Sequence, residues 1–279
     1  MTGGALALVL GAALLHATWN AILKGGSGNR AVALAGISAA HAMVGIVMVL
    51  IFPAPHPDSW FALFVSTVVH YAYYALLYQG YRLGDLSLVY PIARGAAPLL
   101  VAVAAVVVIG EVLSPLGWLG LFTICGGIAL LTLQSWNGRA SRTAIWVAAA
   151  LGLAIGVYSA ADGIGIRASA SPMGYMGWLF LLEFPVPLAI ALVRIRTGRV
   201  IERRAIKFGL IGGFLSVTSY AMVLYANTLA PLGAVSAIRE SSVIIAALIG
   251  VVLFRERPIG GRLLAAAIVA GGVILLAGS

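Results

Sequence analysis

The chain has 279 residues, of which 62% are hydrophobic and only 9% are charged. A soluble domain carries about 25% charged residues, so this composition excludes a water-facing globular fold and predicts an integral membrane protein. The net charge of +9 does not indicate nucleic-acid binding, because membrane proteins use basic residues to hold loops in the cytoplasm. The single cysteine, Cys125, excludes an intrachain disulfide, and no Cys/His cluster has zinc-site spacing. We therefore expect no cofactor and no metal.

Ten apolar runs, each long enough to cross a bilayer, follow one another along the chain. They lie at about 3–23, 31–52, 59–81, 84–109, 115–134, 143–166, 173–194, 205–228, 231–254 and 260–277. The first run has neither a basic start nor a small-residue cleavage site, which favours a helix over a signal peptide. Because the runs are continuously apolar and not alternating, the predicted fold is all-α with ten transmembrane helices.

Polar, aromatic and proline residues interrupt the first five runs. The candidates for a buried polar site are, in chain order, His16, Trp19, Asn20, Tyr74, Tyr78, Tyr90 and Arg94. Tyr74 and Tyr78 belong to a stripe of tyrosines at helical spacing, a pattern that also occurs in core packing and in an interfacial aromatic belt. Pro91 and Pro98 in the fourth run are candidate gating hinges. We expect His41, His56 and His70 to be structural or loop residues.

The last five runs contain a second set of polar residues: Asp162, Glu183, Tyr220, Asn227, Arg239 and Glu240. Glu183 precedes Pro185 and Pro187, which remove backbone donors and predict a broken or kinked helix. A carboxyl group at that depth is neutral unless it is paired, because burial disfavours the charged form. Asp162 is expected nearer the outer end of its helix, where it is either solvated or a proton-coupling group.

Charges within the bilayer are costly, so each one is a functional candidate or a member of an ion pair. Arg94 and Arg239 approach the midplane from opposite faces. Each either binds a carboxylate or phosphate or forms a structural pair with Glu183, Asp162 or Glu240. Adjacent helix residues point about 100° apart, so Arg239 and Glu240 should each have a partner on another helix. Glu111 and Glu256 lie in loops, where we expect a capping role.

An internal repeat relates the two halves of the chain. Arg94 and Arg239, Glu111 and Glu256, and the pairs Gly126-Gly127 and Gly271-Gly272 are each 145 positions apart. Tyr74 matches Tyr220 at 146, and the segment 16–24 aligns with 158–166, which places Asn20 opposite Asp162. The repeat predicts two five-helix units, residues 1–136 and 143–279, joined by a linker at 137–142.

An odd number of helices in each unit requires the second unit to enter the membrane from the opposite side, so the repeat is inverted. Loop charges agree, because 14 of the 17 basic residues fall after odd-numbered helices. Loop 110–118 has no basic residue, whereas its counterpart 255–262 has three. The positive-inside tendency makes the basic face cytoplasmic and places both termini outside.

The five-plus-five helices, the GE and RE loop signals before a final helix with a glycine pair, and the HATWN segment at 16–20 together resemble the drug/metabolite transporter superfamily, in particular its EamA-type members. The resemblance covers nearly the whole chain. It implies a secondary transporter in the cell inner membrane, often an exporter of amino acids or other small metabolites, with the substrate cavity enclosed between the two halves. The degenerate Gly, Pro and Glu motifs do not identify the substrate.

The resulting hypothesis is alternating access around a midplane site lined by helices one, three, four, six, eight and nine. The substrate is a small polar or amphiphilic metabolite with an anionic group. The assigned substrate-binding residues are Arg94, Arg239, Asn20, Trp19, Tyr74, Tyr78, Tyr90, Tyr220 and Asn227. The proton-coupling candidates are Glu183, Asp162 and His16. The protein is expected to be a monomer or a homodimer.

Two alternatives belong to other classes: a membrane-embedded enzyme acting on lipid head groups and a non-transporting assembly or sensor subunit. The sequence contains no Walker A, G-x-S-x-G or H-E-x-x-H motif, so we predict no catalytic residues. The inverted repeat favours transport, because alternating access needs two mirrored conformations and neither alternative does.

Overall fold

The computed structural model describes the chain except residues 26–28, 84–85, 136–140 and 246–258, and the side chains of 24–25, 81–83, 86–92, 135 and 259. The described elements are α1 (Gly3–Gly25), α2 (Arg30–Ile51), the 3-10 turn η1 (Pro57–Ser59), α3 (Trp60–Leu83), α4 (Leu86–Ile109), α5 (Pro115–Ser135), α6 (Arg142–Ala168), α7 (Pro172–Leu181), α8 (Pro185–Arg196), α9 (Arg203–Ala226), α10 (Leu232–Arg239) and α12 (Ile259–Ala277). In this part of the chain the fold is all-helical.

Nine of the ten predicted helix positions agree with these elements within a few residues. The ninth, predicted at 231–254, differs: α10 ends at Arg239, and the chain turns at 240–241 before helical residues resume at 242–245. The predicted seventh helix is broken, because α7 ends at Leu181 and α8 begins at Pro185, as the two prolines indicated. Eight spans in the described residues are long and apolar enough to cross a membrane, with α7 and α8 counted as one span. The count of ten is therefore not determined, since the start of the fourth run (84–85) and the end of the ninth (246–254) lie outside the described residues.

Short polar side chains determine where several helices begin. The Asn29 side chain accepts hydrogen bonds from the backbone N–H groups of Ala31 and Val32 at the start of α2. Ser141 caps α6 and Ser171 caps α7 in the same manner. Each cap satisfies backbone donors that have no partner within the helix, which matters most where no water is available.

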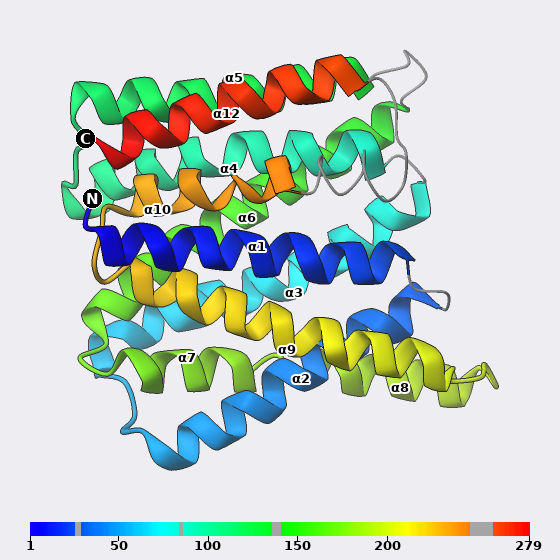
Figure 1. Cartoon of the computed structure of the whole chain (residues 1–279). Helices are drawn as coiled ribbons and strands as arrows, with labels where there is room; N and C mark the ends of the chain where they lie inside the picture. Colours follow the sequence, from blue (N-terminus) through cyan, green and yellow to red (C-terminus); the bar gives the residue numbers. More distant parts are fainter. Residues whose placement is uncertain (26–28, 84–85, 136–140, 246–258) are drawn as a thin grey trace.

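The helices form one bundle in which the two ends of the chain lie at the same face (Figure 1), and the N-terminal amino group lies 3.3 Å from the Ser279 carbonyl oxygen. Helices from different halves pack together: α5 with α12, α2 with α7 and α9, α1 with α9, and α3 and α4 with α6. The chain halves are therefore intertwined and do not form separate lobes.

Glycines show that the α5–α12 contact is symmetric. A Cβ atom built on Gly127 would lie 2.6 Å from Val269 and 3.2 Å from the Ala265 carbonyl oxygen. The same atom on Gly272 would lie 2.7 Å from Ile124 and 2.8 Å from the Gly120 carbonyl oxygen. Adding 145 to one member of each contact and subtracting it from the other converts the first pair of contacts into the second. The repeat read from the sequence is thus also a repeat of contacts.

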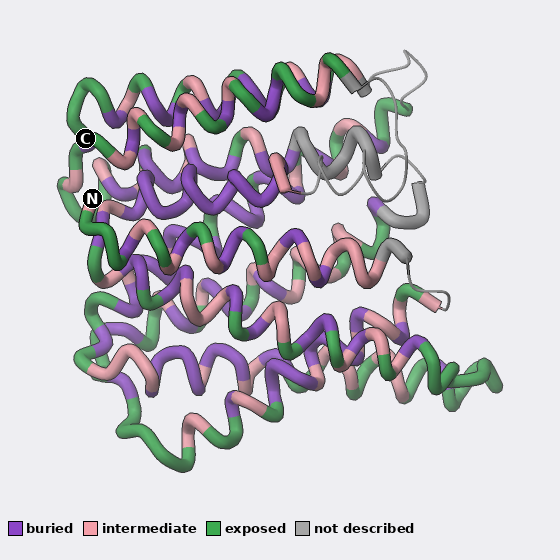
Figure 2. Tube along the Cα trace, viewed as in Figure 1, coloured by how far each residue is buried: buried purple, intermediate pink, exposed green. Residues whose placement is uncertain are grey.

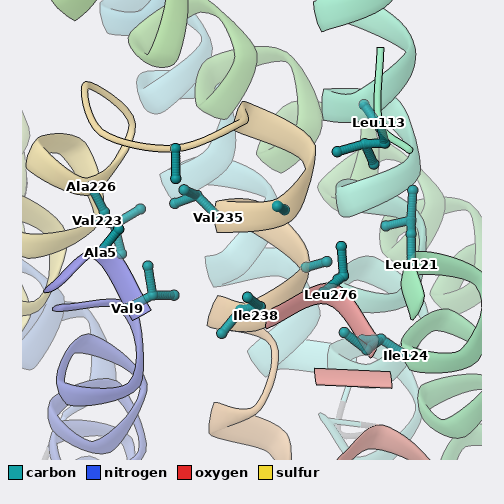
Figure 3. Packing of buried hydrophobic residues seen from close by; sticks show 14 of the residues in the cluster. Ala5, Val9, Leu113, Leu121, Ile124, Val223, Ala226, Val235, Ile238 and Leu276 are labelled. Atoms are coloured by element: carbon teal, nitrogen blue, oxygen red, sulfur yellow. The ribbon is translucent and has the colours of Figure 1, made fainter. Parts of the chain in front are cut away.

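Burial is reversed relative to a soluble protein. Large apolar side chains cover the outer surface, among them Leu50 at 81% and Phe61 at 78% exposed. The helices nearest the centre, such as α10, are buried along their length (Figure 2). Small residues allow α1, α5, α10 and α12 to approach closely in the largest core cluster, where Val9, Ile124 and Ile238 lie (Figure 3).

Candidate functional site

A cavity of about 90 Å³ lies in the middle of the bundle. Its walls come from α1, α3, α4, α6, α9 and α10, the six helices expected from the sequence. Two elements that were not expected also line it. These are α2, through Leu34, Ile37 and His41, and the α7–α8 break, through Glu183. Water needs roughly 10–15 Å³ by this measure, so the space holds several water molecules or one small ligand.

The two arginines meet at one carboxylate beside the cavity. Arg94 Nη1 donates to both oxygens of Glu240, at 2.9 and 2.8 Å. Arg239 Nη2 lies 3.5 Å from Glu240 Oε1. All three side chains are at least nine-tenths buried. Glu240 thus has the interhelical partner that the sequence indicated. The same expectation for Arg239 is wrong among the described residues, because its ion pair is with the adjacent Glu240. Gly95 occupies the position of the first half that matches Glu240, 145 residues earlier.

Arg239 keeps an unsatisfied donor. Its Nε is buried and has no hydrogen-bond partner among the described residues. Two guanidinium groups share one carboxylate, so these three residues carry one net positive charge inside the bilayer. Such a charge is costly to bury without a counterion. The arrangement can bind an anion, and Arg239 is the arginine with a donor to spare.

His16 connects the arginine cluster to the aromatic wall of the cavity. Arg94 Nη2 contacts His16 Nε2, and the indole N–H of Trp19 donates to His16 Nδ1 at 3.3 Å. A neutral imidazole has one accepting nitrogen and a protonated one has none. His16 can therefore satisfy only one of these donors at a time, and it is placed to respond to a change at Arg94.

Glu183 lies at the α7–α8 break and is fully paired. Its Oε1 is 3.0 Å from His41 Nδ1, and its Oε2 accepts a hydrogen bond from the Tyr74 hydroxyl at 2.6 Å. The Leu182 carbonyl beside it, freed by the break, accepts from the Tyr71 hydroxyl. The prolines therefore expose a polar site at the centre of the bundle, and α2 and α3 supply the groups that satisfy it.

The prediction that Asp162 is solvated near the outer end of its helix is wrong. Its side chain is fully buried. The Tyr175 hydroxyl donates to Oδ1 at 3.0 Å and the Tyr220 hydroxyl to Oδ2 at 2.5 Å. The bundle closes over this position because α7 and α9 bring the two tyrosines to α6. The carboxylate joins three elements and lies just beyond the cavity wall formed by Tyr220.

The other predicted residues are distributed unevenly. Trp19 and Asn20 line the cavity. Tyr78 does not line it and is 40% exposed on the outer surface of α3. Asn227 is the residue that follows the end of α9, and it is buried away from the cavity. Pro98 lies within the continuous helix α4.

The side chains of Tyr90 and Pro91 lie outside the described part of the chain, so their predicted roles remain predictions. His56, expected in a loop, caps η1.

His41 and His70 line the cavity although the sequence reading assigned them no role there. His70 stacks on Tyr158, with ring centroids 4.1 Å apart. A signal for His41 existed: it precedes Glu183 by 142 residues, the offset that relates segment 16–24 to 158–166. The structure brings these two residues into contact between α2 and the α7–α8 break.

Glu111 caps a helix, as expected, but one in the other half of the chain. Its Oε2 accepts from the Leu232 N–H at the start of α10, and its Oε1 pairs with Arg167 at 3.2 Å. Arg167 also donates to the carbonyl oxygens of Asn227 and Ala230, at 2.6 and 2.7 Å. This cluster fastens α6 and the α4–α5 loop to the α9–α10 connection. Glu256 lies outside the described residues.

The fold and the cavity define a class: a multi-pass helical membrane protein with a polar site enclosed between two repeats. Within that class the EamA-like transporter family model matches residues 3–133 and 142–278. The chain therefore belongs to the EamA-like transporter family, within the drug/metabolite transporter superfamily, as its sequence motifs indicated. The family consists of membrane transporters of small molecules and is generally non-enzymatic.

Solved structures share the fold. A crystal structure described only as that of a protein superposes with a TM-score of 0.78 over 99% of both chains, at 17% sequence identity. At this identity the likeness concerns the fold alone. No curated protein sequence matches the chain.

Proposed function

We propose that this protein is a secondary transporter that carries a small metabolite with an anionic group, held by Arg239. The observation that carries the proposal is the asymmetry between the two arginines. Glu240 occupies Arg94 through two hydrogen bonds, whereas Arg239 Nε has no partner among the described residues and its side chain lines the cavity. A carboxylate or phosphate there would neutralise the excess charge of the cluster.

The proposed architecture is ten transmembrane helices in two inverted five-helix units, residues 1–136 and 143–279, with a linker at 137–142. The matching contacts of Gly127 and Gly272 support it. So does the pairing of helices, since α1–α9 and α3–α6 are the same contact with the halves exchanged. Alternating access then consists of exchanging the conformations of the two units around the cavity.

The cavity wall indicates what else the substrate carries. Trp19, Tyr73, Tyr74, Tyr158 and Tyr220 surround the space. They offer apolar ring faces with hydroxyl or indole N–H groups at their edges. A small amphiphilic metabolite, such as an amino acid or a related organic acid, fits this mixture and the limited volume. Export is the proposed direction.

Coupling to protons is proposed at the Glu183–His41 pair. The pair lies in the cavity wall and contains an acidic group, whereas the arginine cluster is basic. Tyr74 connects the pair to the aromatic residues. Proton uptake there would change the charge of the cavity without touching Arg239. Asp162 and His16 remain the other candidates for this role.

The protein is proposed to reside in the cell inner membrane with its basic loops in the cytoplasm and both termini outside. The proximity of Met1 and Ser279 supports placing the termini at one face. The basic residues Arg196, Arg199, Arg203 and Arg204 lie in or beside the α8–α9 connection, at the other face in the proposed topology.

Thermal stabilisation of the purified protein by separate metabolites tests the proposal, because a ligand that binds only the folded state raises the apparent stability. The panel is amino acids, organic acids, sugar phosphates, amines and cationic drugs. We expect an anionic or zwitterionic hit that Arg239→Gln abolishes and Arg239→Lys weakens. Asp58→Asn, the same loss of a carboxylate charge at an exposed position in η1 outside the cavity, is the matched control. Stabilisation by cations alone, lost in Glu183→Gln, would contradict the proposed substrate class.

A further inference from the structure

Asp162 and Tyr220 connect helices from opposite walls of the cavity. Asp162 is on α6, which packs with α3 and α4, and Tyr220 is on α9, which packs with α1 and α2. Their hydrogen bond of 2.5 Å therefore closes the space between the two walls. It does so on the side of the chain termini, toward which α6 and α9 run in Figure 1.

The same end carries a second closure. Arg167 and Glu111 fasten α6 to the α9–α10 connection at 2.6–3.3 Å, one to two helical turns beyond Asp162. At the opposite end the cavity lining continues through Asn20, Leu34 and Leu77. In this conformation the cavity is thus closed by polar bonds toward the termini, and its lining extends toward the other end.

The repeat gives each closing residue a counterpart. Asp162 corresponds to Asn20 at an offset of 142, and Tyr220 corresponds to Tyr74 at 146. Asn20 is on α1 and Tyr74 on α3, so this pair also faces across the two walls, nearer the opposite end. Here the two do not bond to each other: Asn20 Nδ2 donates to the His16 carbonyl of its own helix, and Tyr74 donates to Glu183.

We propose that Tyr220–Asp162 and Tyr74–Asn20 are the two alternating gates of this protein. The first is closed in the present conformation. In the opposite conformation the Tyr220 hydroxyl leaves Asp162, and the Tyr74 hydroxyl leaves Glu183 and donates to the Asn20 side-chain oxygen. An amide oxygen accepts such a bond as a carboxylate does, without carrying a charge. This inference rests on the proposed alternating access, but it does not depend on the identity of the substrate.

The gates are chemically unequal, and this inequality has a consequence. A hydrogen bond to a carboxylate is about twice as strong as one between neutral groups. Tyr220–Asp162 is therefore the stronger closure, so the resting population favours the conformation closed toward the termini. Release of Tyr74 from Glu183 also links the second gate to the proposed proton site.

Two-sided thiol labelling tests the gates. Ser216→Cys places a reporter in the cavity wall, in a background with Cys125→Ser, and a membrane-impermeant maleimide is applied from each side of the membrane in intact cells and in everted vesicles. Tyr220→Phe removes the first gate's bond, and we expect labelling from the terminal side to rise about fivefold to tenfold. Asn20→Ala removes the second gate's acceptor and so disfavours the conformation that is open toward the termini. Labelling from the terminal side should therefore fall about threefold.

Tyr78→Phe, a hydroxyl removed from the exposed surface of α3, is the matched control and should change neither rate. Labelling after denaturation normalises each variant for the amount of protein. Opposite shifts in Tyr220→Phe and Asn20→Ala support the proposal, whichever side carries the termini. Shifts of the same sign, or shifts no larger than in Tyr78→Phe, overturn it. The labelling assay contains no ligand, so it tests the gates independently of the substrate. If no metabolite binds, the proposed function fails, but the labelling result for the gates stands.

Discussion

Individual residues of this protein derive their roles from their partners across the repeat. Arg94 and Arg239 occupy equivalent positions, yet a single glutamate on one side makes them different. Because Arg94 holds both oxygens of Glu240, its removal would leave a buried carboxylate with only the longer contact to Arg239. Breaking a buried ion pair costs about 3–5 kcal/mol, so Arg94 is expected to stabilise the fold and Arg239 to bind the ligand.

The first residue-scale prediction separates these roles. Arg94→Gln should lower the melting temperature of the purified protein in detergent markedly more than Arg239→Gln does. Arg239→Gln should retain its melting temperature and lose ligand stabilisation. Differential scanning fluorimetry with and without ligand measures both quantities. If the two variants lose stability equally, the inequality between the arginines is not functional.

Glu183 provides the second residue-scale prediction. Glu183→Gln keeps an oxygen that can accept from Tyr74 but cannot carry a negative charge opposite His41. If the proton is carried here, an acidic exterior should accelerate export by the parent protein and leave the variant's rate unchanged within about twofold across the histidine titration range. Transport in proteoliposomes with an imposed pH gradient measures the effect, with Asp58→Asn, an exposed carboxylate in η1, as the control. A variant that still responds to the gradient would move the coupling to Asp162 or His16.

Elements in this protein approach one another through glycines whose placement follows the repeat. Each repeat ends in a helix with two adjacent glycines, and only one of each pair faces the other helix. Gly127 and Gly272 lie in the α5–α12 contact, whereas a Cβ atom added to Gly126 or Gly271 would meet nothing within 4 Å beyond the adjacent backbone of its own helix. Sequence reading found both pairs but could not say which member faces the contact.

The element-scale prediction uses this difference. Gly272→Ala places a methyl group 2.8 Å from the Gly120 carbonyl oxygen, so the helices must separate, at a cost of about 1–3 kcal/mol. Gly271→Ala, one position earlier, meets no neighbour and should be neutral or slightly stabilising. Melting temperatures of the two variants measure the difference, and Gly127→Ala against Gly126→Ala repeats the test in the other half. Equal effects within a pair would mean that α5 and α12 do not pack in this register.

At the scale of the whole molecule, the side of the membrane on which each terminus lies tests the proposed topology. In the proposed topology, two five-helix units return the chain to the side on which it began, and Met1 lies against Ser279. We expect reporter tags on both termini to indicate the outside and a tag in the 197–202 connection to indicate the cytoplasm. Alkaline phosphatase and green fluorescent protein fusions distinguish the two sides. Termini on opposite sides would contradict ten spans, whichever side is basic.

Composition and hydropathy alone determine that this is a helical membrane protein. The spacing of Arg94, Glu111 and the first glycine pair from their counterparts predicts the repeat. These features are readable because bilayer thickness sets the length of each apolar run and a duplicated fold preserves the spacing of its residues. The break beside Glu183 was also predictable, since proline cannot continue the backbone hydrogen bonds of a helix.

Only the tertiary structure decided which polar residues meet. Asp162 was readable as solvated because its position along α6 does not reveal that Tyr175 and Tyr220 cover it. The repeat offset between His41 and Glu183 was present in the sequence, but only the packing of α2 against the α7–α8 break brings the two side chains into contact. Tyr78 could not be distinguished from Tyr74 until the orientation of α3 was known. Sequence position gives depth in the membrane, but the rotation and neighbours of each helix come from packing, and these determine which side chains face the cavity.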